Sequence, residues 1–218
     1  MPPRYREWLK FVFDRPTTPD PWYFDLDSGE FAAEPTELAD LIATTFEQGG
    51  RDLAPYSDEQ IRYGLSYILE NGCSDTVYAL KSDDVPLALR LRAIRSLDKL
   101  YADVFQHRCA PVLGHLSQSG GNALNDSCYM LWDASSLAYW GSTSNGHVFY
   151  DAIAEVMHHA LQSSNPACVE SGLHGLGHIH AYQPERVEQI IDAFVRNGVA
   201  RDPALRDYAH AARTGSVL

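Results

Sequence analysis

Apolar residues recur every three or four positions along most of the chain, which is the spacing of one face of an α-helix. The clearest run covers residues 149–161, where phenylalanine, isoleucine, valine, methionine and leucine follow this spacing. No stretch alternates apolar and polar residues with the period of two that is typical of strands. We therefore expect an all-α fold, with helices over residues 5–12, 35–46, 57–70, 86–105, 123–139, 149–161, 165–181, 184–196 and 203–214.

Helix-boundary residues stand where this spacing begins and ends. Ser57 followed by Gln60 has the form of a capping box, and Asn197-Gly198 is typical of a helix C-terminus. The arginines of the helix that begins at Pro86 are expected on its solvent-facing arc. Four further predicted helices have a proline at their start, namely Pro35, Pro166, Pro184 and Pro203. Proline is favourable there because the N–H that it lacks would have no partner inside the helix.

The chain is expected to form one helical domain over residues 1–218. Residues 1–56 are the least regular part, because Pro16, Pro19 and Pro21 exclude continuous helix beyond the first short one. We expect this irregular N-terminal segment to pack on the domain, with the aromatic residues 22–24 over the end of the core.

Residues 86–218 give the clearest internal repeat, with helix pairs at roughly the 40-residue period of HEAT and armadillo units. Residues 165–197 have the order of a HEAT repeat: a proline-opened helix, a short turn with a second proline, and an amphipathic helix. Such pairs stack to bury the apolar faces that each leaves uncovered. The expected architecture is a HEAT-like α-α superhelix, a short solenoid of antiparallel helix pairs.

The chain also resembles a set of bacterial proteins of unassigned function that share this HEAT/armadillo-like architecture. Three blocks carry the resemblance: Leu124–Asp133, Ala167–His178 and Ala204–Leu218. The resemblance implies the helical-repeat fold and no particular activity.

Charge and composition narrow the classes of partner. The 218 residues include 29 acidic and 17 basic side chains, which gives a net charge of −12. Such a surface repels phosphate backbones, so no nucleic-acid partner is expected, and a basic protein is the preferred partner. The sequence shows no secretory signal, no stretch long enough to span a membrane and no CxxC pair. A cytoplasmic location with no membrane partner is therefore expected, and the oligomeric state stays open.

One group of residues has the spacing of metal ligands. Glu170, His174 and His178 follow one another at intervals of four residues, so they share one face of the predicted helix 165–181. Two histidines at this spacing can hold one transition metal, with the glutamate as a third ligand or as an acceptor that orients a histidine. Alternatively, the histidines only pack between helices, since Gly172, Gly175 and Gly177 would allow a neighbouring helix to approach closely.

A HEAT-like di-iron enzyme, deoxyhypusine hydroxylase, is a possible parallel for such a site. That enzyme carries His-Glu pairs on successive inner helices, whereas here His174 is followed by glycine and His178 by isoleucine. The pattern also occurs on one helix alone. The parallel therefore gives no support to a di-iron site.

Two functional hypotheses follow. The first is a non-enzymatic protein–protein interaction module, in one version an acidic inhibitor or immunity-type protein. Its candidate partner-binding residues are Trp22, Tyr23 and Trp140, and we expect Trp140 to be the most exposed of them. It names no catalytic residue and expects no cofactor. The alternative is a metal-dependent enzyme or metal-binding protein, with a transition metal at Glu170, His174 and His178.

Overall fold

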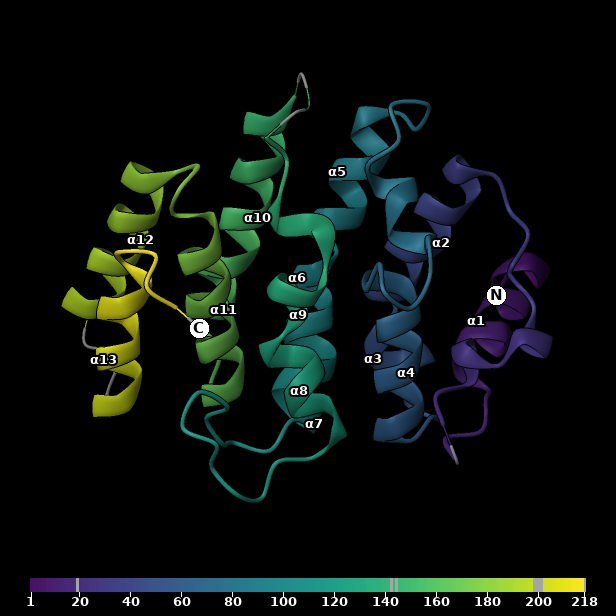
Figure 1. The fold of residues 1–218 in the computed structure, drawn as a ribbon, viewed down its shortest axis with the longest axis horizontal. Coiled ribbons are helices and arrows are strands. Elements are labelled where there is room, and N and C mark those ends of the chain that lie inside the picture. Colours follow the sequence, from purple (N-terminus) through teal and green to yellow (C-terminus); the bar gives the residue numbers. More distant parts are fainter. Residues whose placement is uncertain (19, 142, 144, 198–201, 218) are drawn as a thin grey trace.

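A computed structural model describes residues 1–18, 20–141, 143, 145–197 and 202–217. The helices stand side by side along the long axis of the molecule, from α1 at one end to α12 and α13 at the other (Figure 1). The described residues contain no strand, only one isolated bridge between Glu70 and Ser135. The expected all-α class is confirmed.

The N-terminal part begins with an amphipathic helix, α1 (Pro3–Phe13), whose buried face carries Trp8 and Val12. Two 3-10 turns follow in an otherwise irregular stretch, η1 (Trp22–Phe24) and η2 (Leu26–Ser28). Regular structure resumes with α2 (Pro35–Glu47), α3 (Gly49–Asp52), α4 (Asp58–Leu69) and η3 (Thr76–Leu80). The sequence predicts that residues 1–56 are irregular, but the part without an α-helix is limited mainly to the residues between α1 and α2 and a few residues before α4.

The capping box predicted at Ser57 is present at the start of α4. The Ser57 hydroxyl accepts a hydrogen bond from the Gln60 N–H at 3.2 Å, and the Gln60 side-chain oxygen accepts one from the Ser57 N–H at 3.0 Å. Both bonds satisfy N–H groups that have no partner inside the helix.

The helix predicted from residue 86 is a nearly continuous run that contains a π-helical turn. It comprises α5 (Leu87–Arg95), α6 (Leu97–Leu100), the π-helical η4 (Tyr101–Phe105) and α7 (Gln106–Arg108). The prediction that its arginines face solvent is wrong for Arg90, which is 3% exposed. Because α10 packs against α5, it covers part of the arc that the periodicity assigned to water, and Arg90 lies over the ring of Phe149.

The single helix predicted over residues 123–139 is wrong in its continuity. It divides into α8 (Ala123–Tyr129), α9 (Leu131–Ala134) and the 3-10 turn η5 (Ser136–Ala138). Ser135 has an extended backbone, and its bridge to Glu70 ties this segment to the end of α4.

The last four predicted helices are confirmed as α10 (Gly146–Ala160), α11 (Pro166–Ile179), α12 (Pro184–Arg196) and α13 (Pro203–Ala212). Asn197 is the C-cap of α12, whereas Gly198 lies outside the described residues.

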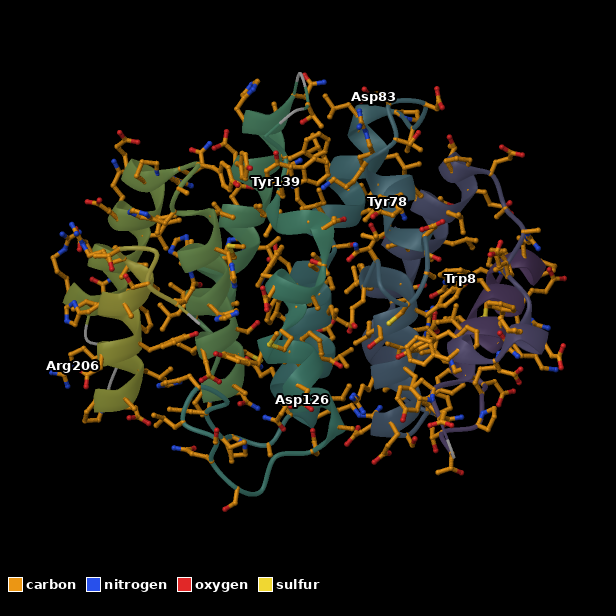
Figure 2. The ribbon with its side chains drawn as sticks, in the orientation of Figure 1. Trp8, Tyr78, Asp83, Asp126, Tyr139 and Arg206 are labelled. Atoms are coloured by element: carbon orange, nitrogen blue, oxygen red, sulfur yellow. The ribbon has the colours of Figure 1, made fainter. Side chains whose placement is uncertain are left out.

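The helices form two layers. α2, α5, α10 and α12 contact one another in sequence, and so do α4, α8, α11 and α13. α10 also packs on α11, and α12 on α13, across the layers. One apolar core extends from Tyr5 to Ala212; Trp8 lies inside it, while Asp83 and Arg206 lie at the margin of the molecule (Figure 2). None of the described helices combines the length and apolar character needed to cross a bilayer.

Candidate metal centre

Helix α11 is the most enclosed helix near the candidate site, since almost every residue from Ala167 to Ile179 is buried. Its glycines make this possible. A Cβ at Gly172 would lie 2.8 Å from the Met157 carbonyl oxygen, and one at Gly175 would lie 2.5 Å from the Trp132 ring. The interpretation that these glycines permit close helix approach is confirmed.

Two histidines on this helix turn their ring nitrogens toward each other. The Nε2 atoms of His174 and His178 are 3.0 Å apart. His174 is 1% exposed, whereas the side chain of His178 is 30% exposed, so the pair reaches from the core to the surface. The i, i+4 spacing read from the sequence thus places both imidazoles at one point.

A carboxylate from another helix completes the group. Asp133, on α9, has its Oδ1 atom 3.6 Å from the Nε2 of His178, and its side chain is 45% exposed. One ligand atom from each of Asp133, His174 and His178 lies within 4.8 Å of the others. Among the described residues, this is the one set of three or more histidine, cysteine or acidic side chains that meets this criterion.

The second ring nitrogen of His174 is held from α13. Its Nδ1 lies 2.6 Å from the Tyr208 hydroxyl, and that hydroxyl lies 3.2 Å from the hydroxyl of Tyr129. If Nδ1 carries the proton and donates to Tyr208, Nε2 presents its lone pair toward His178. A hydrogen bond from the non-ligating nitrogen is the usual way in which proteins orient a metal-binding histidine.

Glu170, expected as a third ligand, is engaged elsewhere. Its buried carboxylate accepts hydrogen bonds from the N–H groups of Gly114 at 2.7 Å and His115 at 2.9 Å, and it also contacts the His115 ring. The face of α11 turns by roughly 40° for each step of four residues, which directs Glu170 toward the loop at 109–122. The His115 ring in turn stacks on Tyr208, with centroids 4.2 Å apart, so Glu170 supports the group indirectly.

The pKa shifts fit a ligating role for His174. Burial, followed by the nearby His178, lowers the pKa of His174 to about 4, so the imidazole is neutral at pH 7. The neutral ring is the form that binds metals. Burial also raises the pKa of Tyr208 well above its ordinary value, which keeps the phenol protonated.

The spacing of the two histidines matches the distance between ligands around one ion. Two nitrogens that each lie about 2.0–2.1 Å from a metal are roughly 2.9–3.4 Å apart in tetrahedral or octahedral geometry. The distance of 3.0 Å between the two Nε2 atoms falls in this range. The Asp133 oxygen lies slightly farther away, at 3.6 Å from the Nε2 of His178, and the Asp133 side chain is 45% exposed.

Two further histidines of the C-terminal half, His159 and His180, have other partners. His159 contacts Asp98, with its Nδ1 2.9 Å from the carboxylate, and His180 lies 3.9 Å from a Glu188 oxygen. The sequence pattern missed Asp133, because only the packing of α9 against α11 brings it to the histidines.

The candidate partner-binding aromatic residues have different surroundings. Trp140 is 1% exposed and stacks on Phe149 with centroids 3.9 Å apart, so the prediction that it is exposed is wrong. The Trp140 ring is held in the core by Phe149 and by a hydrogen bond from its Nε1 to the Leu137 carbonyl oxygen at 2.5 Å. Trp22 is buried and Tyr23 half-buried, and both line a cavity at the other end of the molecule.

In comparisons with protein-family models, with curated proteins and with solved structures, the chain matches none of them.

Proposed function

We propose that the protein binds one divalent transition-metal ion through His174, His178 and Asp133. The observation that carries this proposal is the pair of Nε2 atoms 3.0 Å apart, with the far nitrogen of His174 anchored on the Tyr208 hydroxyl. Glu170, an expected ligand, is replaced by Asp133 in this proposal.

The ligand set selects the class of metal. Two imidazoles and one carboxylate suit Zn²⁺, Fe²⁺, Co²⁺ or Ni²⁺, whereas Mg²⁺ and Ca²⁺ prefer oxygen ligands alone. Three protein ligands leave at least one coordination position for water or another small ligand. The exposed side of Asp133 and His178 is where such a ligand would enter.

Titration of metal-free protein with Co²⁺ and Zn²⁺ by calorimetry tests the proposal. We expect one ion per chain, and at least about tenfold weaker binding in His178→Asn and Asp133→Asn, since each removes one ligand. His210→Asn is the matched control, because His210 is exposed on α13. Absence of stoichiometric binding, or equal binding by all four proteins, would contradict the proposal.

We further propose that the two layers form the HEAT-like superhelix expected from the sequence and from the resemblance to bacterial helical-repeat proteins. The support is that α10 pairs with α11 and α12 with α13, while helices of each layer contact the next in order. An experimental structure in which successive pairs are related by a constant rotation is the expected result. Pairs related by unrelated rotations would contradict it.

A second function, binding of a basic protein, is favoured by two exposed apolar side chains. Phe24 is 62% and Leu26 99% exposed, on a protein with a net charge of −12. Affinity capture would compare wild type with the double variant Phe24→Ser, Leu26→Ser and with Tyr78→Ser, a control at another exposed site. A partner that high salt releases, and that the double variant alone fails to hold, supports this function. A partner held equally by all three proteins contradicts it.

A further inference from the structure

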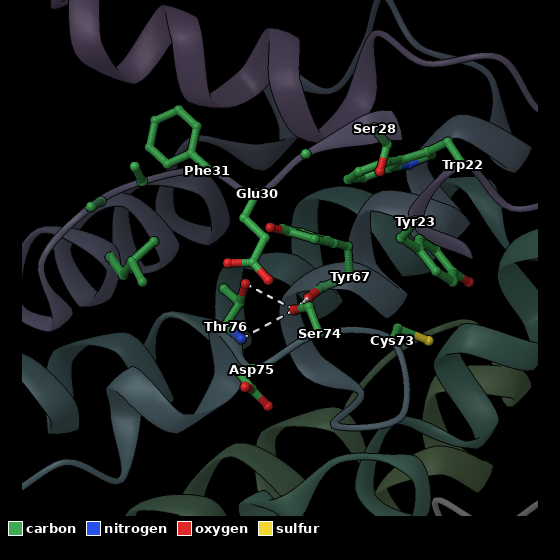
Figure 3. A pocket seen from close by; sticks show the side chains of 14 residues that line it. Trp22, Tyr23, Ser28, Glu30, Phe31, Tyr67, Cys73, Ser74, Asp75 and Thr76 are labelled. Carbon is green, nitrogen blue, oxygen red and sulfur yellow. Dashed lines mark hydrogen bonds between the residues drawn. The ribbon is translucent and has the colours of Figure 1, made fainter. Parts of the chain in front are cut away.

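A second candidate binding site lies at the opposite end of the molecule from the histidines. A cavity of about 320 Å³ opens between the irregular segment 22–33 and the residues that follow α4 (Figure 3). Its volume falls in the range of small-molecule sites, which begins at about 300 Å³.

Aromatic rings form much of its wall. Trp22 packs on Tyr67 with centroids 4.8 Å apart and on Tyr23 with centroids 5.6 Å apart. The guanidinium of Arg15 lies 4.6 Å from the centre of the Trp22 ring, which fixes that ring further. Arg15 does not line the cavity. The wall is therefore held in place before any ligand arrives.

The polar groups in the cavity are carboxylates and hydroxyls. Glu30 lies in the middle of the view, with its carboxylate directed toward Thr76 and Ser74 (Figure 3). The Ser74 and Thr76 hydroxyl oxygens are 2.9 Å apart. Asp75 is the second acidic residue of the lining, and the described residues of the lining include no lysine or arginine. The cavity therefore favours a positively charged group.

We propose that this cavity binds a small aromatic amine. Its ammonium group pairs with the Glu30 carboxylate, and its ring packs on Trp22 and Tyr67. The acidic lining of the cavity selects the charge of the ligand, and the aromatic wall selects its ring. The negative charge of the whole protein also attracts cations.

Three probes of similar size separate these features: 2-phenylethanolamine, which is cationic; 2-phenylethanol, which is neutral; and mandelate, which is anionic. Binding to the full chain would be measured by saturation-transfer NMR and calorimetry, with a chelator present so that a metal at His174 has no influence. We expect the amine to bind at least about tenfold more tightly than the alcohol, and mandelate to bind most weakly.

Variants assign the effect to the cavity. Glu30→Gln should bring the affinity of the amine down to that of the alcohol, whereas Glu34→Gln, an exposed control outside the lining, should leave it unchanged. Trp22→Phe should weaken the binding of both the amine and the alcohol, since it removes part of the aromatic wall. Because Glu30 is exposed, its variant keeps the test valid even if Trp22→Phe fails to fold.

Three outcomes would overturn the proposal. They are equal affinity for amine and alcohol, preference for mandelate, and no binding of the amine at millimolar concentration. An amine preference that survives Glu30→Gln would also place the ligand elsewhere and overturn it.

Discussion

His174 shows how burial and hydrogen bonding prepare a single side chain for one role. Its ring is enclosed by the core, its Nδ1 contacts the Tyr208 hydroxyl at 2.6 Å, and its Nε2 faces the Nε2 of His178. Burial keeps the imidazole neutral, and the contact with the Tyr208 hydroxyl occupies its Nδ1. Residues on three helices, α9, α11 and α13, must therefore be in place before a metal can bind.

Tyr208→Phe tests this orienting contact. Removing the hydroxyl leaves the Nδ1 of His174 without its partner, so we expect about 10- to 100-fold weaker Co²⁺ binding, with the fold retained. Calorimetric titration and circular dichroism would measure the two effects. Tyr139→Phe is the control, because Tyr139 is exposed at another site. Unchanged affinity in Tyr208→Phe would show that the hydroxyl does not orient the ring.

Cys73 provides a second test at the residue scale. Burial raises the pKa of its thiol from 9.0 to about 11, so less thiolate is present at a given pH. We expect alkylation by iodoacetamide near pH 8 to be about 100-fold slower than in the unfolded chain, and to accelerate as the pH rises toward 11. Mass spectrometry would follow the reaction, and Cys73→Ser would identify the labelled site. A rate equal to that of the unfolded chain would contradict the raised pKa.

At the scale of elements, the packing of α11 depends on positions where no side chain fits. A Cβ on Gly175 would lie within 2.5–2.7 Å of the Trp132 ring and of the Met157 side chain. Both side chains belong to the core, since Trp132 is 1% exposed and Met157 is fully buried. The contact of α11 with α9, and hence the approach of Asp133 to the histidines, depends on this glycine.

Gly175→Ala should therefore destabilise the protein, despite the higher helix propensity of alanine. We expect a loss of about 1–3 kcal/mol in the free energy of unfolding, the usual cost of overpacking, measured by urea denaturation. Gly72→Ala is the matched control, because a Cβ at Gly72 meets no atom within 4 Å. A Gly175→Ala protein as stable as the control would show that the helices separate without cost.

The elements with strong periodicity and clear caps could be predicted from the sequence. The capping box at Ser57 and the proline starts of α11, α12 and α13 are local signals, and local physics decides them. The end of the helix at Ser135 and the burial of Arg90 could not be predicted, because they involve contacts with Glu70 and with α10, which are distant in the sequence.

The candidate site was predictable in part for the same reason. His174 and His178 lie one helical turn apart, so the sequence alone pairs them. Glu170 lies one helical turn before His174, but its carboxylate accepts hydrogen bonds from the loop that carries Gly114 and His115. Asp133 comes from a separate helix, and no spacing rule connects it with α11.

At the scale of the whole molecule, metal binding and folding are linked. The proposed ligands come from α9 and α11, and α13 orients one of them, so an ion that binds only the folded chain stabilises all three helices together. The cavity beside Trp22 lies at the other end of the row of helices and shares none of these residues (Figure 1).

Metal should raise the melting temperature of the whole protein. At a free Co²⁺ concentration 100 times the dissociation constant, mass action contributes about 2.7 kcal/mol. For a chain of this size we expect a rise of roughly 5–10 °C, reversed by EDTA and absent in His178→Asn. Differential scanning calorimetry would measure it. A melting temperature that does not change with metal, or that changes equally in the variant, would contradict the linkage.

X-ray absorption at the edge of the bound metal tests the proposed metal centre most directly. For Zn²⁺ bound to the wild-type chain, we expect two imidazole nitrogens at about 2.0–2.1 Å with oxygen ligands beside them, and one imidazole fewer in His178→Asn. A first shell of oxygen or sulfur alone, or an unchanged shell in the variant, would contradict the assignment of the metal to His174, His178 and Asp133.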